Sequence, residues 1–198
     1  MTDFPTLDLG RSQGVFSAAD ATGRGIHSQQ LTRLVAQGVL ERVSHGHYRL
    51  VGQPVTEHHG LVMAAKAVPA GVVSLLSALS FHGIGSQLPS RVWLTVPRGA
   101  PTPRVAAPPL QVVRATGDSF SQGIEVHQIE GVPVRIYSVA KTIADLFKHR
   151  NRIGIDVAIE ALGEAWRERR FAMAELEAAT RVCRVSRVIR PYLEAVVT

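Results

Sequence analysis

The sequence predicts an α+β protein in which a winged helix-turn-helix domain, residues 1–51, precedes a mixed α/β domain, residues 52–198. Three features predict this fold class. Two short helical segments around a Gly-Arg-Gly break are followed by a hairpin pattern within the first fifty residues. Alternating apolar residues between 91 and 137 indicate a small sheet of about four strands. From residue 138 onward apolar residues recur at helical spacing, which predicts helices that back this sheet.

The composition is that of a globular protein with a basic balance. The chain has 198 residues, of which 45% are hydrophobic and 19% charged, and its net charge is +6. Arginines supply most of the positive charge, which favours phosphate and base-edge contacts. The single cysteine, Cys183, excludes an intrachain disulfide and favours a reducing, cytoplasmic location. The start MTDFPTLDLG is not a signal peptide, and Lys66, Pro69 and Gly71 interrupt the apolar run 61–81, so we expect no membrane segment.

A first short helix is predicted to begin after Ser17. Serine is a favoured N-cap residue, and Asp20 stands at the third helical position, where a carboxylate stabilises the helix N-terminus. Gly23 and Gly25, on either side of Arg24, break this helix. The break supplies the turn of a helix-turn-helix pair.

The second helix of the pair is predicted over residues 28–37, with Ser28 as its N-cap. At about 100° per residue, Leu31, Leu34 and Val35 share one face of this helix. The opposite face carries no acidic residue and consists of Gln29, Thr32, Arg33 and Ala36. Glutamine, arginine, threonine and alanine all suit base edges in the major groove, so we expect this face to read DNA.

A hairpin is predicted from residues 39–43 and 47–50 around the turn Ser44-His45-Gly46. Helix, turn, helix and basic hairpin is the winged-helix order, and the hairpin would contact the DNA backbone or minor groove. His45-Gly46-His47 could instead hold a metal, but two histidines without a third ligand nearby are a weak signal.

The predicted DNA contacts come from the second helix, the turn before it, the wing and one loop of the second domain. They are Arg24, Ser28, Gln29, Gln30, Thr32, Arg33, Ala36, Gln37, His45, His47, Tyr48, Arg49, Arg98 and Arg104. We expect the exposed helix face to contact bases, and the helix N-terminus and wing to contact phosphates.

The second domain is predicted to follow a linker at 52–54 and to alternate helices with strands before ending in helices. Strands are expected at 91–97, at 110–116 and on either side of Glu130-Gly131. Helices are expected after Thr56 and Ser74, and then over 138–150, 155–170, 173–182 and 185–197.

No nucleotide-binding, zinc-protease or serine-hydrolase motif is present, so we expect no catalytic residue, metal or cofactor. Glu160 and Glu164 have metal-ligand spacing, but a solvated helix face is the simpler interpretation. Lys141 and Asp145 are interpreted as an ordinary i,i+4 pair. Cys183 has arginine neighbours that could activate a thiol, although a buried cysteine is the commoner outcome.

Two further groups are open to more than one interpretation. His58-His59 lies in the first turn of a predicted helix and is interpreted as surface or packing residues rather than metal ligands. Four arginines recur at three-residue steps near the C-terminus, and on one helix they would cover half of its surface. They could bind an anionic partner or form a solvated or acid-paired face: Arg181, Arg184, Arg187 and Arg190.

The chain resembles the AbiEi-type antitoxins of type IV toxin–antitoxin systems. Four stretches carry the resemblance: GVLERVSHGHYRL; SLLSALSFHGI with RVWLTVPRG; GVPVRIYSVAKTIADLFKHRNRIGIDVAIEALGEAW; and RVCRVSRVIRPYLEAV. Together they cover most of residues 14–197, and the third is the most specific. A winged helix alone would not separate this family from other regulators.

The resemblance implies an antitoxin that binds promoter inverted repeats, represses its own operon and takes part in abortive infection, a phage defence. It also implies a cognate AbiEii-like nucleotidyltransferase toxin, with which no stable complex need form, countered by the C-terminal domain. Residues 1–50 carry five arginines against four acids. Since so small a positive charge binds DNA weakly, we expect two copies on the operator, or help from Arg98 and Arg104.

Two other functions stay open from the sequence. A nuclease or nucleotide-transferring domain fused to a DNA reader would need a divalent metal and Glu160, Glu164 or Asp145. A protein-interaction module whose winged helix packs on a partner would show no salt-dependent affinity for DNA, because only phosphate binding releases counterions.

Overall fold

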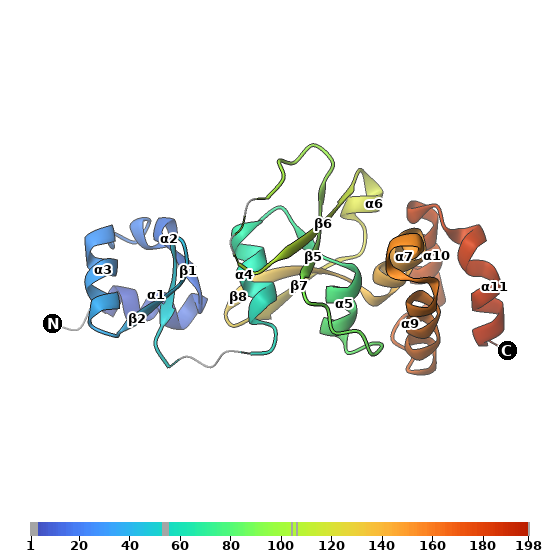
Figure 1. Cartoon of the computed structure of the whole chain (residues 1–198), viewed down its shortest axis with the longest axis horizontal. Coiled ribbons are helices and arrows are strands. Elements are labelled where there is room, and N and C mark those ends of the chain that lie inside the picture. Colours follow the sequence, from blue (N-terminus) through green and yellow to red (C-terminus); the bar gives the residue numbers. More distant parts are fainter. Residues whose placement is uncertain (1–3, 53–55, 104, 106, 198) are drawn as a thin grey trace.

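The computed structural model describes residues 4–52, 56–103, 105 and 107–197. Three groups of elements follow one another along the longest axis of the molecule (Figure 1): N-terminal helices and strands, a central sheet with its helices, and a C-terminal layer of helices. The α+β class is therefore confirmed.

The first group, here called the N-terminal unit, has the winged-helix arrangement. Its antiparallel sheet has the order β1-β3-β2, and the β2–β3 hairpin is the wing. The elements are α1 (Phe4–Gln13), β1 (Phe16–Ser17), α2 (Ala18–Thr22), α3 (Ser28–Ala36), β2 (Leu40–Ser44) and β3 (His47–Leu50). The predicted helix pair and hairpin are confirmed.

Helix α1 was not predicted from the sequence. Its ten residues include Pro5 and Gly10, which lower helix propensity, and its apolar residues form no clear stripe. The glycine has a packing reason, because a Cβ on Gly10 would lie 2.6 Å from Cγ of Leu50. Helix α1 therefore gains its stability from close contact with β3 rather than from its own sequence.

The predicted N-cap of α2, Ser17, is confirmed, whereas the predicted N-cap of α3, Ser28, is wrong. The Asp20 amide donates to Ser17 Oγ at 3.0 Å, and the Ser17 amide donates back to Asp20 Oδ2 at 2.8 Å. The N-cap of α3 is His27, and Ser28 is already helical. Burial of Ile26, which is 1% exposed, keeps the chain extended up to His27 and so places the helix start one residue earlier.

The second group is a five-stranded sheet among the described residues, where about four strands were expected. Its order is β6-β5-β4-β8-β7; the pairs β5–β6 and β4–β8 are parallel and the other two antiparallel. The elements are α4 (His59–Ala67), β4 (Val72–Val73), α5 (Leu75–His82), β5 (Val92–Pro97), β6 (Leu110–Ala115), α6 (Asp118–Ser121), β7 (Ile124–Ile129) and β8 (Val132–Tyr137). Strand β4 was missed because two residues cannot show alternation.

Helices α4 and α5 pack on the sheet through one apolar cluster. Val92, Leu94 and Val96 are all buried in it, as the alternation along β5 predicts. Helix α4 begins after His58 rather than Thr56, because the backbone and hydroxyl of Thr56 both bond to Glu130. The predicted linker at 52–54 lies largely outside the described residues.

The third group consists of helices that continue the core from the sheet to the C-terminus. They are α7 (Val139–Lys148), α8 (Arg150–Ile153), α9 (Ile155–Arg167), α10 (Met173–Cys183) and α11 (Ser186–Val197). Ser138 caps α7, because its Oγ accepts from the Lys141 amide at 3.3 Å. Two four-residue helices, α6 and α8, were not predicted because such short segments carry no periodic pattern.

The Lys141–Asp145 pair is not the ordinary surface pair that the spacing suggested. The Lys141 side chain is 1% exposed, its Nζ lies 2.5 Å from Asp145 Oδ2, and it stands 4.1 Å from the centre of the Tyr137 ring. Cys183 on α10 donates to Asp145 Oδ1 at 3.2 Å. Packing of α10 over α7 excludes water from this pair, a tertiary effect that i,i+4 spacing cannot reveal. Burial raises the pKa of the Cys183 thiol to about 12, so it is not a reactive thiol.

The N-terminal unit has its own core but is also packed into the central sheet. Val15 and Val43 join the sheet cluster beside Ile129 and Val132. Gly14, at φ +61°, lies so close to the β7–β8 turn that a Cβ would stand 1.8 Å from the carbonyl oxygen of Glu130. We call this contact region the joint.

On the sheet side of the joint, Glu130 holds the start of the second domain to the β7–β8 turn. Its Oε1 accepts from the amide and hydroxyl of Thr56, both at 2.9 Å, and its Oε2 lies 2.8 Å from His59 Nδ1. Burial alone would raise the pKa of Glu130, but these hydrogen bonds together lower it below its ordinary value. Across the joint, Lys66 Nζ donates to Asp20 Oδ2 at 3.2 Å.

We expect Gly14→Ala to lower the free energy of unfolding by at least about 3 kcal/mol, because the new methyl group displaces the Glu130 backbone. Gly46→Ala is the matched control, since Gly46 has φ +73° and open space around it. The control should cost about 1 kcal/mol for the positive φ alone. Equilibrium urea unfolding measures both, and equal losses would contradict the close contact.

We expect Lys141→Met to cost about 3–5 kcal/mol, because it leaves the Asp145 carboxylate buried without its cation. The double variant Lys141→Met/Asp145→Leu should recover part of this loss. Lys148→Met removes only a hydrogen bond to Ser119 and should cost about 1 kcal/mol. Urea unfolding checks the series, and a double variant less stable than Lys141→Met would show that the pair is not a coupled unit.

Candidate nucleic-acid interface

Helix α3 lies at the N-terminal end of the molecule (Figure 1) and presents a polar face to solvent. Leu31 and Leu34 are 1% and 4% exposed and anchor the helix to the N-terminal unit. The opposite side is exposed and carries Gln29, Thr32, Arg33, Ala36 and Gln37. No acidic residue occurs in α3, so nothing on this helix repels phosphate.

Hydrogen bonds within α3 determine which of its donors and acceptors remain available to bind DNA. Thr32 Oγ1 donates to the carbonyl of Ser28 at 3.1 Å, so the hydroxyl proton is used within the helix. No side-chain hydrogen bond caps the start of α3 at His27. The helix N-terminus therefore offers its positive dipole end to an anion. Arg24 is exposed in the turn that leads into α3.

The wing is stiffened by hydrogen bonds among its own residues. The Arg42 guanidinium lies 3.2 Å from His45 Nδ1, and His47 Nδ1 lies 3.2 Å from Ser44 Oγ. The Ala18 amide donates to the Gly46 carbonyl at 2.8 Å, which ties the wing turn to the start of α2. His45 is exposed at the tip, whereas Tyr48 is half-buried and stacked on Phe16 at the base.

Arg49 is less available than the sequence suggested. It stands opposite Glu41 in the wing, and its Nε pairs with the Glu41 carboxylate. Its side chain is only 16% exposed. Arg42, which the sequence analysis did not select, is exposed beside His45 instead. The β2–β3 register explains this exchange, because cross-strand neighbours are set by pairing and not by residue type.

Arg98, one of the two arginines predicted from the second domain, does not join this surface. Arg98 is exposed in the β5–β6 loop, where its amide donates to the Ala115 carbonyl at 2.9 Å. In Figure 1 this loop lies over the central sheet, well away from α3. Arg104 lies outside the described residues.

The four C-terminal arginines are divided between two helices, in line with the separate helices predicted over 173–182 and 185–197. Arg181 belongs to α10, Arg184 ends that helix at φ +59°, and Arg187 and Arg190 belong to α11. All four are exposed. Arg190 Nε donates to Glu194 Oε1 at 2.8 Å, so only this arginine matches the acid-paired interpretation. The left-handed residue Arg184 reverses the chain and divides the series.

Candidate metal and catalytic groups are used in packing. Among the described residues, no group of three or more histidine, cysteine, aspartate or glutamate side chains could hold a metal ion. Glu160 is exposed, whereas Glu164 Oε2 accepts from the Gly85 amide at 2.9 Å. His59 bonds to Glu130, and the His58 ring packs on Phe81 with centres 5.0 Å apart.

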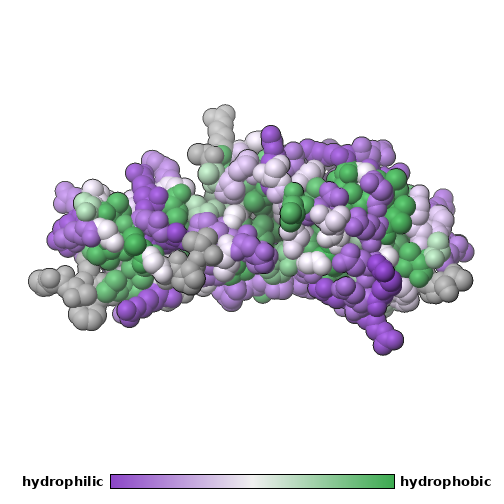
Figure 2. Space-filling view, turned by 60° about the horizontal axis from the view of Figure 1, so that its bottom comes forward, coloured by the Kyte–Doolittle hydropathy of each residue, from purple (hydrophilic) through white to green (hydrophobic). Residues whose placement is uncertain are grey.

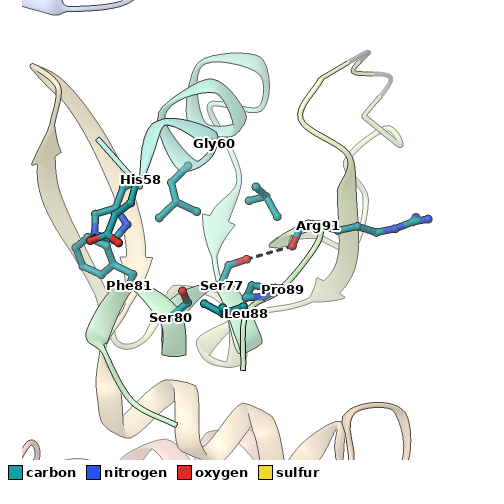
Figure 3. A pocket seen from close by; sticks show the side chains of 11 residues that line it. His58, Gly60, Ser77, Ser80, Phe81, Leu88, Pro89 and Arg91 are labelled. Atoms are coloured by element: carbon teal, nitrogen blue, oxygen red, sulfur yellow. Dashed lines mark hydrogen bonds and ion pairs between the residues drawn. The ribbon is translucent and has the colours of Figure 1, made fainter. Parts of the chain in front are cut away.

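A cavity of about 300 Å³ lies between α4, α5 and the segment before β5 (Figure 3). Its lining includes Ser77, Ser80 and His58, residue types that could form a nucleophile and base. Ser77 Oγ, however, donates to the carbonyl of Arg91 and accepts from the Trp93 amide at 2.9 Å. The Ser77 hydroxyl is therefore used to hold α5 to β5. Among the described side chains, no hydrogen bond joins Ser77 to His58, so the two do not form a nucleophile and base pair.

The part of the chain that the structure describes contains no helix that could span a membrane. No described helix combines the length and apolarity that crossing a bilayer requires. Figure 2 shows hydrophilic and apolar side chains interspersed along the length of one face.

Comparisons with known proteins agree with this geometry at the N-terminal end. Residues 7–51 match the family model described as a transcriptional regulator, AbiEi antitoxin, which confirms the resemblance over that segment. The match runs from within α1 to just past the wing. No curated protein sequence matches the chain.

The fold as a whole has a relative among solved structures. The crystal structure of the RV2827C protein from Mycobacterium tuberculosis aligns with a TM-score of 0.59. The alignment covers 91% of this chain and 71% of that chain at 13% sequence identity. At this identity the likeness concerns the fold alone.

Proposed function

We propose that this chain is a DNA-binding transcriptional regulator and antitoxin that represses its own operon at promoter inverted repeats. The observation that carries the proposal is the exposed, acid-free face of α3 beside a basic wing, within a segment that matches the AbiEi antitoxin model. Winged helices with this surface place their third helix in the major groove of double-stranded DNA.

The side chains divide into base and phosphate contacts. Gln29, Arg33 and Ala36, with the methyl group of Thr32, are assigned to base edges. Ser28, Gln30 and Gln37 at the helix ends, with Arg24, are assigned to phosphates. The wing adds His45, His47 and, in place of the paired Arg49, Arg42. Tyr48 supports the wing from its base.

Two copies of the chain on one operator follow from the small charge of the N-terminal unit. Five arginines against four acids in residues 1–50 release few counterions from DNA. An inverted repeat lets two units bind at once, which multiplies the effective affinity without new contacts.

The antitoxin half of the proposal rests on the family match. We assign to residues 52–198 the role of countering a nucleotidyltransferase-type toxin of the AbiEii kind, in the cytoplasm and without the need for a stable complex. This is the type IV arrangement, and phage defence by abortive infection is the setting we propose for it. Rescue of growth by residues 52–198 in cells that express the toxin gene from the same operon tests this role.

The first experiment measures binding to the DNA immediately upstream of the gene against a scrambled fragment of equal length, at two salt concentrations. We expect a preference for the upstream fragment and an affinity that falls steeply with salt. Equal binding to both fragments, or none, would favour a protein-interaction module. Magnesium-dependent cleavage of either fragment would favour the nuclease alternative.

We expect Arg33→Ala to cost about 1–3 kcal/mol on the upstream fragment and to reduce the preference over the scrambled one, because a base contact is lost. Arg24→Ala, a phosphate contact, should weaken binding to both fragments equally. Arg187→Ala on α11 is the matched control and should change neither. Wild-type affinity and salt dependence in Arg33→Ala would show that α3 does not read the operator.

A further inference from the structure

A cleft of about 530 Å³ separates the N-terminal unit from the central sheet. One wall comes from the start of α2 and from β3, through Asp20 and His47. The other comes from the end of α4, through Lys66, and from β7 and β8, through Val126 and Arg135. The cleft therefore belongs to neither unit alone, and its shape depends on how the joint holds the two.

The charge that lines the cleft is positive. Lys66 and Arg135 are cations and Asp20 is the one carboxylate among the lining residues, so the cations are in excess. The one carboxylate, Asp20, is already engaged, since its Oδ2 accepts from the Ser17 amide and from Lys66 Nζ. These bonds outweigh burial and lower the pKa of Asp20 below its ordinary value, so it is ionised at neutral pH.

Arg135 is the cation that the fold leaves without an acid. Its guanidinium carbon stands 5.8 Å from the centre of the Phe120 ring, which positions the side chain. No carboxylate among the described residues lies within ion-pair distance of Arg135. Arg135 is half-buried, lines the cleft and has its guanidinium beside an aromatic ring, so it can bind a carboxylate or phosphate through two hydrogen bonds.

Apart from Ser17 and His47, the rest of the lining is apolar or glycine. Val126 stands directly opposite Arg135 in the β7–β8 pairing and is 61% exposed, although most valines of the sheet are buried. Val132 and Pro133 extend this surface on β8. A ligand that fills the cleft therefore needs an apolar body as well as an anionic group.

We propose that this cleft binds a small organic anion, a carboxylate or phosphate carried on an apolar or aromatic body. Arg135 binds the anionic group, and Val126 with Pro133 contacts the body. A phosphate of the DNA backbone has the same anionic chemistry. A duplex backbone is hydrated, however, and has no apolar group to contact the apolar residues of the cleft.

Occupancy of the cleft would act on the wing, a consequence that rests on the proposed function. His47 lines the cleft and lies in β3, and Asp20 lines it and caps α2. An anion between these groups and Arg135 changes the attraction between the N-terminal unit and the sheet. The bound anion then favours one orientation of α3 and the wing over another.

Calorimetric titration of the full chain without DNA tests the site directly. Phenylphosphonate is the probe for the whole ligand. Inorganic phosphate represents its anionic half alone, and benzyl alcohol its apolar half alone. We expect saturable binding of phenylphosphonate that is about tenfold tighter than binding of either half. Arg135→Gln should weaken it about tenfold, whereas Arg187→Gln, at the far end of the molecule, should leave it unchanged.

A second pair of variants guards against loss of folding. Val126 is exposed, so Val126→Asp and the isosteric Val126→Asn should both fold. We expect the aspartate to weaken phenylphosphonate binding about tenfold more than the asparagine, because only the aspartate repels the anion. No saturable binding by the wild type, or equal binding by all variants, overturns the proposal.

A DNA titration separates this site from the proposed function. If Arg135→Gln weakens binding to the upstream fragment while phenylphosphonate does not bind the wild type, the cleft holds a backbone phosphate and the proposal fails. If phenylphosphonate binds and no fragment does, the site stands and the regulator function fails. Both stand if phenylphosphonate changes operator affinity in the wild type and not in Arg135→Gln.

Discussion

The contact between Gly14 and the β7–β8 turn is the constraint on which the arrangement of the molecule depends. The chain passes from α1 into β1 at this point, and no side chain larger than hydrogen fits against the Glu130 carbonyl. Glu130 in turn binds the start of the second domain through Thr56 and His59. This contact therefore restricts the angle at which the winged helix leaves the sheet, and with it the direction in which α3 faces.

The molecule is held at both ends of its sheet by buried or half-buried charge. At the N-terminal end, the Asp20–Lys66 pair connects the winged helix to α4, and Glu130 holds α4 to the β7–β8 turn. At the other end, Lys141 and Asp145 connect β8 and α7 to α10 through Tyr137 and Cys183. Buried ionic pairs add little net stability but strongly disfavour packings that leave one partner alone. These pairs therefore favour one relative position of the three groups of elements, which apolar contacts alone would not define.

Local patterns in the sequence predict the elements better than they predict contacts. The Ser17–Asp20 capping box, the wing, the alternation along β5 and the polar face of α3 follow from neighbouring residues, and the structure contains all four. Helix α1, strand β4 and the burial of Lys141 depend on partners far along the chain. The exchange of Arg42 for Arg49 as the exposed wing arginine depends on strand register. Such information does not lie in any short window of sequence.

The position of the cleft gives the joint a role beyond rigidity. A rigid connection between winged helix and sheet would need only apolar packing, as Val15 and Val43 already provide. The structure instead places a cleft with an unneutralised arginine beside that packing, on the side where β3 and α2 meet the sheet. Because a ligand shifts an equilibrium only by its difference in affinity between two states, a site built from both units is the kind that can sense their relative orientation. The apolar contacts then set the resting orientation, and the charged cleft supplies the means to change it.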